Sequence, residues 1–364
     1  MSNSVLIIRF SALGDVAMLS PVVRQYAMKH PDYDVTVLSQ PFCATLFDNI
    51  APNVHFLGRD IKRDYQGVGG LYRLFRELHA MHFDRIVDCH DVLRTKVLRM
   101  FFKGHRYSIS TIDKHRRLRK ELTAMPPKKQ LRQLPTSFEN YWEALEPGNH
   151  SLSGNSSLSA SSPLGVSAPR ETRGQEGSYG SGLESGLLFG IAPFAAHEGK
   201  IYPLDLMEQV VAQLSEKGTV ILFGGKGHEE EVMRAWAEKY NKVSLARDVI
   251  AEANASADTT MSGLSGLAAE LELMRRLTVM VSMDSANMHL ASLVGTRVVS
   301  VWGATHPYAG FLGWGQKESD CVQVERPCRP CSIYGNKPCR YGDYPCLTDI
   351  KPEQIVKVCS INWL

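Results

Sequence analysis

Long apolar runs are missing from this sequence, and neither sign of charge dominates it. No stretch approaches the about 18 to 20 apolar residues that span a bilayer, and the apolar run near the N-terminus ends at Arg9. We therefore expect a cytoplasmic protein without a signal peptide. The formal net charge of +3 is too small to indicate nucleic-acid binding by itself. A content of 44% hydrophobic and 22% charged residues is typical of a globular protein, and 364 residues fit two domains.

A glycine-rich phosphate loop is missing too. The stretch RFSALGDVAML, residues 9–19, directly follows the apolar run VLII, which predicts a strand, a tight turn and a helix. The turn has a single glycine, Gly14, and it matches neither of the two common phosphate-loop patterns. A carboxylate, Asp15, follows at once and would repel a phosphate. The acid at this position therefore needs another explanation.

Cysteine is not scarce, because the chain has eight, six of them after residue 320. A cytoplasmic location predicts that they are reduced. The run CRPCSIYGNKPCRYGDYPC, residues 328–346, begins with a C-x2-C pair of the kind that binds zinc, but its second pair lacks the usual short spacing. We favour free thiols and expect no metal and no cofactor, with a zinc site as the alternative.

The first part of the chain alternates between strand and helix patterns. Strands are predicted at residues 5–10, 34–39, 54–58 and 84–90, and helices at 15–30, from 42 and at 71–79. This alternation implies parallel strands in a right-handed, doubly wound sheet. We assign residues 1–145 to an N-terminal Rossmann-like domain.

The composition changes to Ser, Gly, Asn and Pro over residues 146–187. We predict a flexible linker or insertion there, because such a segment cannot bury enough apolar surface to become ordered. The alternation then resumes, with strands predicted at 186–193, 219–225, 242–246, 278–283 and 297–303, and helices at 203–217, 229–240, 264–277 and 286–293. Residues 188–364 are therefore a second Rossmann-like domain with a Cys-rich end.

Candidate functional residues follow the predicted strands. Ligands of doubly wound folds bind at the carboxyl ends of strands, and the gap between two such domains is the expected site. Besides Asp15, these positions hold His197, Glu198 and Lys200 after one strand, and Asp284, Ser285 and His289 after another. Backbone N–H groups at a helix start, together with a lysine, would hold a phosphate. Each residue also has a structural alternative, because Asp and Ser cap helices and a buried His or exposed Lys is common.

Five stretches of the sequence together resemble glycosyltransferase family 9, the ADP-heptose:lipopolysaccharide heptosyltransferases. They occur in the family's order and cover nearly the whole chain except the linker. The stretches are VLIIRFSALGDVAMLSPVVR, FDRIVDCHDVLRT, GKIYP, FGGKGHEEE and VSMDSANMHLASLVGTRVVSVWGATHP.

The resemblance implies a GT-B fold, in which two Rossmann-like domains face each other across a cleft, and no metal requirement. It implies that the first domain binds the lipid-borne acceptor and the second the ADP-sugar. By motif, Asp15 matches the catalytic base, which would take a proton from the acceptor hydroxyl and invert the anomeric configuration. The donor-binding residues carried over are Lys200, Glu229, Asp284, Ser285 and His289. The expected acceptor-binding residues are Arg9, Ser11, His90 and Arg94.

Some residues depart from the family pattern. Ala195 and Ala196 precede the lysine where hydroxylated residues are frequent, and Ala286 stands where glycine is frequent. The sugar is therefore expected to be heptose or a related sugar. The segment 103–132 carries ten Lys and Arg against two acids, and we expect it to contact an anionic glycolipid acceptor or the inner membrane surface rather than nucleic acid.

Two other functions are compatible with the sequence. One is a nucleotide-sugar epimerase of similar architecture, which needs no lipid acceptor. The other is a catalytically inactive nucleotide-sugar-binding protein, to which the two alanines give slight support. Transfer, epimerisation and binding alone would be distinguished by incubation with nucleotide-sugars and a truncated lipopolysaccharide core.

Overall fold

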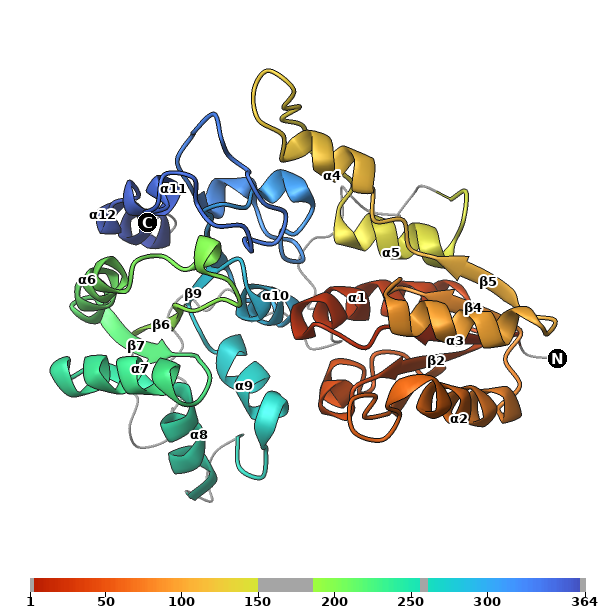
Figure 1. Cartoon of the computed structure of the whole chain (residues 1–364). Coiled ribbons are helices and arrows are strands. Elements are labelled where there is room, and N and C mark those ends of the chain that lie inside the picture. The colour runs from red at the N-terminus through yellow and green to blue at the C-terminus, as the bar shows by residue number, and fades with distance from the viewer. Residues whose placement is uncertain (1–2, 150–185, 256–260, 361–364) are drawn as a thin grey trace. The chain divides into compact units, whose positions relative to one another are not determined.

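The computed structural model describes residues 3–149, 186–255 and 261–360 (Figure 1). By their contacts these residues form two compact units, the first with residues 3–115 and 135–149, the second with residues 116–134 and those after 185. Most of the linker predicted at 146–187 lies outside the described residues. Its first residue, Glu146, ends a helix and accepts a hydrogen bond of 2.7 Å from Lys29 Nζ.

The first unit is a five-stranded parallel sheet in the order β3-β2-β1-β4-β5, with helices packed along it (Figure 1). Every strand and helix predicted for this region is confirmed, with ends that differ by a few residues. The strand β5 and the helices α3 and α5 were not predicted. The elements are β1 (Asn3–Ile8), α1 (Leu13–Lys29), β2 (Tyr33–Ser39), the 3-10 helix η1 (Pro41–Leu46), β3 (Val54–Gly58), α2 (Gly67–Ala80), β4 (Arg85–Asp88), α3 (Leu93–Lys103), β5 (Ser108–Thr111) and α5 (Ser137–Leu145).

The second unit is a six-stranded parallel sheet in the order β11-β10-β9-β6-β7-β8. The strands and helices predicted after residue 185 are confirmed there, and α8, β11, α11 and α12 are additional. The elements are α4 (Arg116–Leu122), β6 (Leu187–Ala192), η2 (Glu198–Lys200), α6 (Leu204–Ser215), β7 (Gly218–Leu222), α7 (His228–Lys239), β8 (Val243–Leu245), α8 (Ala246–Ala255), α9 (Gly266–Arg275), β9 (Val279–Met283), α10 (Ala286–Leu293), β10 (Val298–Val301), η3 (Pro307–Ala309), η4 (Glu318–Asp320), β11 (Cys321–Val322), α11 (Pro345–Thr348) and α12 (Pro352–Ser360).

Strand order fixes where each unit can bind a ligand. The chain passes from β1 to β2 on one side and reaches β4 on the other, so β1 and β4 flank a topological switch point. In the second sheet the switch point lies between β6 and β9. Loops that leave neighbouring strands in opposite directions open a crevice outside their carboxyl ends. The candidate site residues follow these strands, except Glu229, which follows the neighbouring β7.

Residues 116–134, predicted within the first domain, pack in the second unit. We call this segment the basic arm. Arg119 Nη1 donates a hydrogen bond of 2.8 Å to the Tyr334 hydroxyl, and Lys129 Nζ donates one of 2.7 Å to the carbonyl oxygen of Pro330. The sequence prediction placed these residues in the first domain because they precede the linker. The contacts instead join them to residues about two hundred positions later, in the second unit. In the described part of the chain, no helix is long and apolar enough to cross a membrane.

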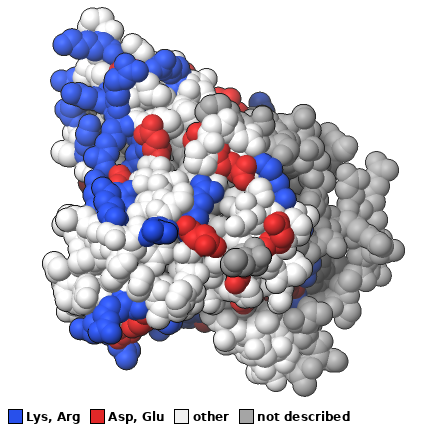
Figure 2. Space-filling model, turned by 90° about the vertical axis from the view of Figure 1, so that its right-hand side faces the viewer, with Lys and Arg blue, Asp and Glu red and all other residues white. Residues whose placement is uncertain are grey.

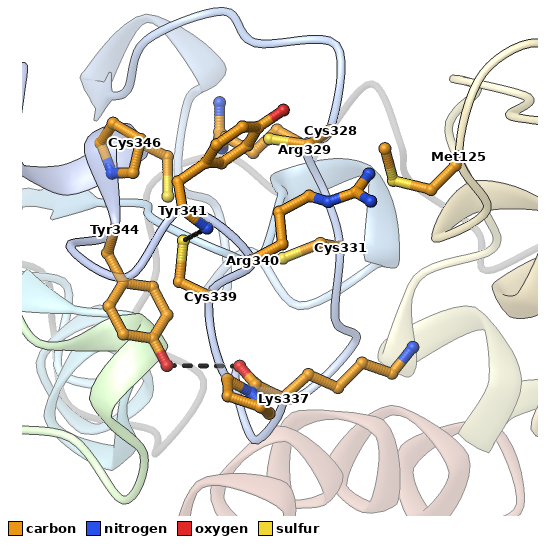
Figure 3. Close-up of a pocket in the computed structure, with 12 residues that line it drawn as sticks. Met125, Cys328, Arg329, Cys331, Lys337, Cys339, Arg340, Tyr341, Tyr344 and Cys346 are labelled. Atoms are coloured by element: carbon orange, nitrogen blue, oxygen red, sulfur yellow. Dashed lines mark hydrogen bonds between the residues drawn. The ribbon is translucent and has the colours of Figure 1, made fainter.

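The Cys-rich segment has little regular structure between β11 and α11. Cys328, Cys331, Cys339 and Cys346 line one cavity of about 240 Å³ (Figure 3). All eight cysteines are free thiols. Burial raises the pKa of Cys346 to about 12, so this thiol is neutral. Among the residues that the structure describes, no three His, Cys, Asp or Glu side chains are placed to hold a metal ion.

A buried arginine, Arg329, holds the Cys-rich segment to the loop after β10. Arg329 is 2% exposed, and its guanidinium donates hydrogen bonds to the carbonyl oxygens of Gly303 at 2.6 Å, Thr305 at 3.1 Å and Val324 at 2.8 Å. A planar cation with five N–H donors satisfies several buried carbonyls at once. This network joins the segment to the loop after β10.

A chelator is expected to leave the melting temperature of the protein unchanged, because the hydrogen bonds of Arg329 hold the Cys-rich segment and the thiols are expected to be free. Arg329→Met should lower the melting temperature, since it leaves buried carbonyls unpaired at a cost of about 1–3 kcal/mol each. Thermal unfolding with and without chelator is the measurement. Stoichiometric zinc in elemental analysis would contradict this prediction.

Candidate functional site

In the first unit, Asp15 stands in the first turn of α1, after the carboxyl end of β1. Its Oδ2 accepts a hydrogen bond of 3.2 Å from the backbone N–H of Ala12, the residue before the helix. The side chain is 32% exposed. Asp15 thus caps its helix and still presents carboxylate surface to solvent, so the structural and functional interpretations are compatible.

Arg9 fixes the position of Asp15. Its Nη2 lies 2.5 Å from Asp15 Oδ2, and its Nη1 donates a hydrogen bond of 2.7 Å to the carbonyl oxygen of Cys89. The guanidinium carbon lies 5.8 Å from the ring centre of Tyr141. The Tyr141 hydroxyl in turn donates a hydrogen bond of 3.2 Å to the backbone oxygen of Asp15. Burial disfavours the charged form of Arg9, but Tyr141 and Asp15 outweigh it and raise the pKa of Arg9.

Arg9 was expected among the acceptor-binding residues, but its side chain is 8% exposed and turned toward Asp15. Ser11 and His90 lie nearby, with 3.5 Å between Ser11 Oγ and His90 Nε2. Burial and the charge of Arg9 lower the pKa of His90 to about 3, so its imidazole is neutral. Arg94 is exposed in the first turn of α3. Arg9, Ser11, Asp15 and His90 are therefore close together outside β1 and β4.

In the second unit, Lys200 and Asp284 come together from the loops after β6 and β9. Lys200 Nζ lies 3.2 Å from Asp284 Oδ2, and the two side chains are 15% and 6% exposed. A nearly buried charge needs an opposite charge beside it. The lysine expected to bind phosphate is thus paired with the aspartate expected in the same site.

Helix α10 begins beside this ion pair. Ser285 occupies its N-cap position but makes no side-chain hydrogen bond to the helix, and its Oγ lies 3.3 Å from Ser282 Oγ. Asp284, the alternative cap, is bound to Lys200. The first-turn N–H groups of α10 therefore keep their capacity to bind an anion. His289 is buried in the same helix, one turn farther along.

Glu229 belongs to the same edge of the second sheet, because it follows β7, the neighbour of β6. Its Oε2 accepts a hydrogen bond of 2.6 Å from the backbone N–H of Gly225. A Cβ on Gly225 would lie 3.1 Å from that oxygen, so glycine permits the close approach. Glu229 is held by its own loop and is partly exposed.

Sequence reasoning missed a glycine that supports Lys200. Gly335 has a φ of +73°, and a Cβ there would lie only 2.4 Å from Lys200 Cγ. The aliphatic stem of Lys200 therefore lies directly on the backbone of the Cys-rich segment. The sequence signal for this glycine is the dipeptide Gly335–Asn336, which is typical of a tight turn.

The two groups of residues suit different chemistry. The first unit offers an ionised carboxylate beside a neutral imidazole, which can accept a proton from a hydroxyl and bind sugar hydroxyls. The second offers a cation, a helix N-terminus and an acid for hydroxyl groups, the features that bind a nucleoside diphosphate.

Comparison with known proteins identifies related chains. The model of the family described as glycosyltransferase family 9 (heptosyltransferase) matches residues 71–341. A glycosyl transferase family 9 structure from Veillonella parvula DSM 2008 aligns with a TM-score of 0.65 and 16% identity over 98% of this chain and 96% of that one. No curated protein matches.

Two further structures are from E. coli. ADP-heptose lps heptosyltransferase II aligns with a TM-score of 0.61 and 16% identity, covering 98% of this chain and 97% of that one. Heptosyltransferase WaaC with ADP-2-deoxy-2-fluoro heptose aligns with a TM-score of 0.56 and 14% identity, covering 91% and 97%. At these identities the likeness shows the fold, which is the predicted α/β GT-B fold.

Gly335→Ala should weaken ADP binding, because the new methyl group displaces Lys200. Gly342→Ala is the matched control: its φ of +90° imposes the same kind of backbone strain, about 1–3 kcal/mol, but a Cβ there meets no atom within 4 Å. Calorimetric titration with ADP measures both. In a Lys200→Ala background, Gly335→Ala should cause no further loss of affinity. Equal affinity of the Gly335→Ala and Gly342→Ala proteins would contradict the support role.

Proposed function

Because this chain belongs to glycosyltransferase family 9, the heptosyltransferase family, and is a glycosyltransferase, we propose that it transfers heptose or a related sugar from an ADP-sugar to a lipopolysaccharide inner-core acceptor. The observation that carries this proposal is the arrangement around Asp15. A partly exposed carboxylate is held by a buried arginine at the switch point of the first sheet.

In the proposed reaction Asp15 is the general base. Its carboxylate takes the proton of the acceptor hydroxyl while that oxygen forms a bond to the anomeric carbon of the donor. The bond between that carbon and the diphosphate oxygen breaks, and ADP leaves with the electron pair. A single displacement with one base inverts the anomeric configuration.

The second unit would hold the donor. Lys200 and the first-turn N–H groups of α10 are suited to the diphosphate, and the diphosphate would compete with Asp284 for the Lys200 ammonium. Glu229 is suited to the ribose hydroxyls, and Asp284, Ser285 and His289 to the sugar side of the diphosphate. The reaction as proposed needs no metal, because these cationic and N–H donors offset the charge that develops on the leaving diphosphate.

The acceptor would be an anionic glycolipid, met at the cytoplasmic surface of the inner membrane. Ser11, neutral His90 and exposed Arg94 are suited to its sugar hydroxyls and acidic groups. Arg9 has a different role in this proposal: it positions Asp15 and keeps it ionised. Two of the similar structures support this class of donor and acceptor. One is named as an ADP-heptose lps heptosyltransferase, and the other contains ADP-2-deoxy-2-fluoro heptose.

Asp15→Asn is expected to lower kcat by about 10² to 10⁴, the usual effect of losing a positioned base. Asparagine is also a good capping residue, so stability should change by under about 1 kcal/mol. Steady-state kinetics with an ADP-sugar and a truncated lipopolysaccharide core, together with thermal unfolding, give the measurement.

Asp205→Asn provides the control, because Asp205 is an exposed acid in the first turn of α6 with no role in the proposed reaction. It should leave kcat and donor affinity unchanged. If the Asp15→Asn protein turned over at close to the normal rate with both substrates saturating, Asp15 would be a helix cap only.

Arg9→Lys should lower kcat by about tenfold or more while the KM for the donor stays constant, because an ammonium cannot bind Asp15 and the Cys89 carbonyl as a planar fork does. Arg9→Met should in addition move the acidic limb of the kcat–pH profile to higher pH, since a carboxylate without its cation binds a proton more readily. If the kcat–pH profile of Arg9→Met were identical to that of wild type, Arg9 would not position Asp15 for the reaction.

A further inference from the structure

Two cations of the basic arm, Arg119 and Lys129, bind it to other parts of the second unit. The Arg119 guanidinium lies over the rings of Phe311 at 5.3 Å and Tyr334 at 5.9 Å. Lys129 Nζ is bound to the backbone oxygens of Cys328 and Pro330. Arg119 and Lys129 thus anchor the arm in the second unit.

The remaining cations of α4 share one face of that helix. At 100° per residue, positions 116, 117 and 120 fall within about 100° of each other, opposite Leu118 and Leu122. Leu122 is fully buried, whereas Arg116, Arg117 and Lys120 are exposed, Arg117 by 84% of its side chain. The arm contains seven Lys and Arg and one acid, Glu121, whose carboxylate lies 3.0 Å from Arg132 Nη2 and 3.9 Å from Arg117 Nη1. One carboxylate leaves the arm with a large excess of positive charge. One face of α4 is therefore an exposed basic face.

Exposed apolar side chains occur in the arm and in the Cys-rich segment. Met125 and Leu131 in the arm are 40% and 48% exposed, and Tyr341 in the Cys-rich segment is 59% exposed. Met125, Tyr341, Lys337 and Arg340 line the same cavity (Figure 3), so the arm and the Cys-rich segment present one common surface. Lys and Arg side chains gather in the upper part of Figure 2, the end at which α4 lies in Figure 1.

We propose that this surface, which we call the arm surface, docks the enzyme on a membrane that contains anionic lipids. It consists of Arg116, Arg117, Lys120, Met125, Lys128, Leu131, Lys337, Arg340 and Tyr341. The inference rests on the proposed function in one respect, that the acceptor is carried by a lipid. It goes further in placing the docking surface in the second unit, outside the residues proposed to bind the acceptor.

The mixture of side chains favours a lipid surface over a nucleic acid. Basic residues gain from the negative potential of anionic headgroups, and Met, Leu and Tyr gain from entering the interfacial region. A nucleic acid would use the cations and could stack a base on Tyr341, but it would leave Met125 and Leu131 in water. The exposed aliphatic residues therefore decide between the two partners.

The number of basic residues removed sets the size of the expected loss of vesicle binding. Each basic residue close to an anionic membrane contributes about fivefold to binding, so removing three should reduce vesicle partitioning on the order of 100-fold. The interaction should also weaken as salt is raised, because it acts over about 10 Å. Met125 and Leu131 add a contribution that salt does not screen.

The experiment compares full-length wild type with the triple variant Arg116→Gln, Arg117→Gln, Lys120→Gln in co-sedimentation with vesicles. One set contains phosphatidylglycerol and phosphatidylcholine in equal amounts, the other phosphatidylcholine alone. Wild type should bind the anionic set and not the neutral one, and the triple variant should lose most of this binding. The control variant Lys217→Gln, Lys242→Gln, Lys357→Gln removes three exposed charges elsewhere in the second unit and should bind like wild type.

Transfer to a water-soluble, deacylated core acceptor separates this inference from the proposed function. The triple variant should keep the wild-type rate on that acceptor, which also shows that it is folded, and lose rate on an acceptor embedded in vesicles. Wild type that transfers sugar but shows no preference for anionic vesicles, or a triple variant that binds them as wild type does, would overturn the docking surface alone. Preference for an oligonucleotide over vesicles would assign the surface to nucleic acid and reject the proposal.

Discussion

Both sheets are made of parallel strands covered by helices, and this constraint decides where polar groups can stand in the protein. In β1 the last four residues are buried, and every residue of β9 is buried. A strand buried on both faces tolerates no unpaired polar side chain, so charged groups are confined to the loops at strand ends. Asp15, Lys200 and Asp284 all follow such strands. The chemistry of the enzyme is therefore located by the burial of its sheets.

The same burial requires that the charges at these strand ends be paired. Asp15 is bound to Arg9, and Lys200 to Asp284, and three of these four side chains are at most 15% exposed. Taking a charge out of water costs several kcal/mol unless an opposite charge or hydrogen bonds compensate. Pairing has a chemical consequence as well, because Arg9 favours the ionised form of Asp15, the form that a base needs.

The Cys-rich segment lies at both of the proposed binding surfaces of the second unit. Its backbone at Gly335 supports the stem of Lys200, and Arg329 joins it to the loop after β10. Its exposed edge, with Tyr341, continues into the basic arm. One irregular segment thus supports the proposed donor site on one side and the proposed membrane surface on the other. The four cysteines among residues 328–346 are buried or half-buried thiols.

The sequence alone determined the alternation of strands and helices, the parallel sheets, the family and the positions of the candidate residues at strand ends, because these are recorded in short-range periodicity and local motifs. Only the tertiary structure decided that Arg9 turns to Asp15 and to Cys89, that Gly335 supports Lys200, and that the basic arm packs in the second unit. Apart from the pair of Arg9 and Asp15, these contacts join residues far apart in the chain, such as Lys129 and Pro330, which are 201 positions apart. A periodic pattern reports which side of its own element a residue faces, but not which distant segment covers that side.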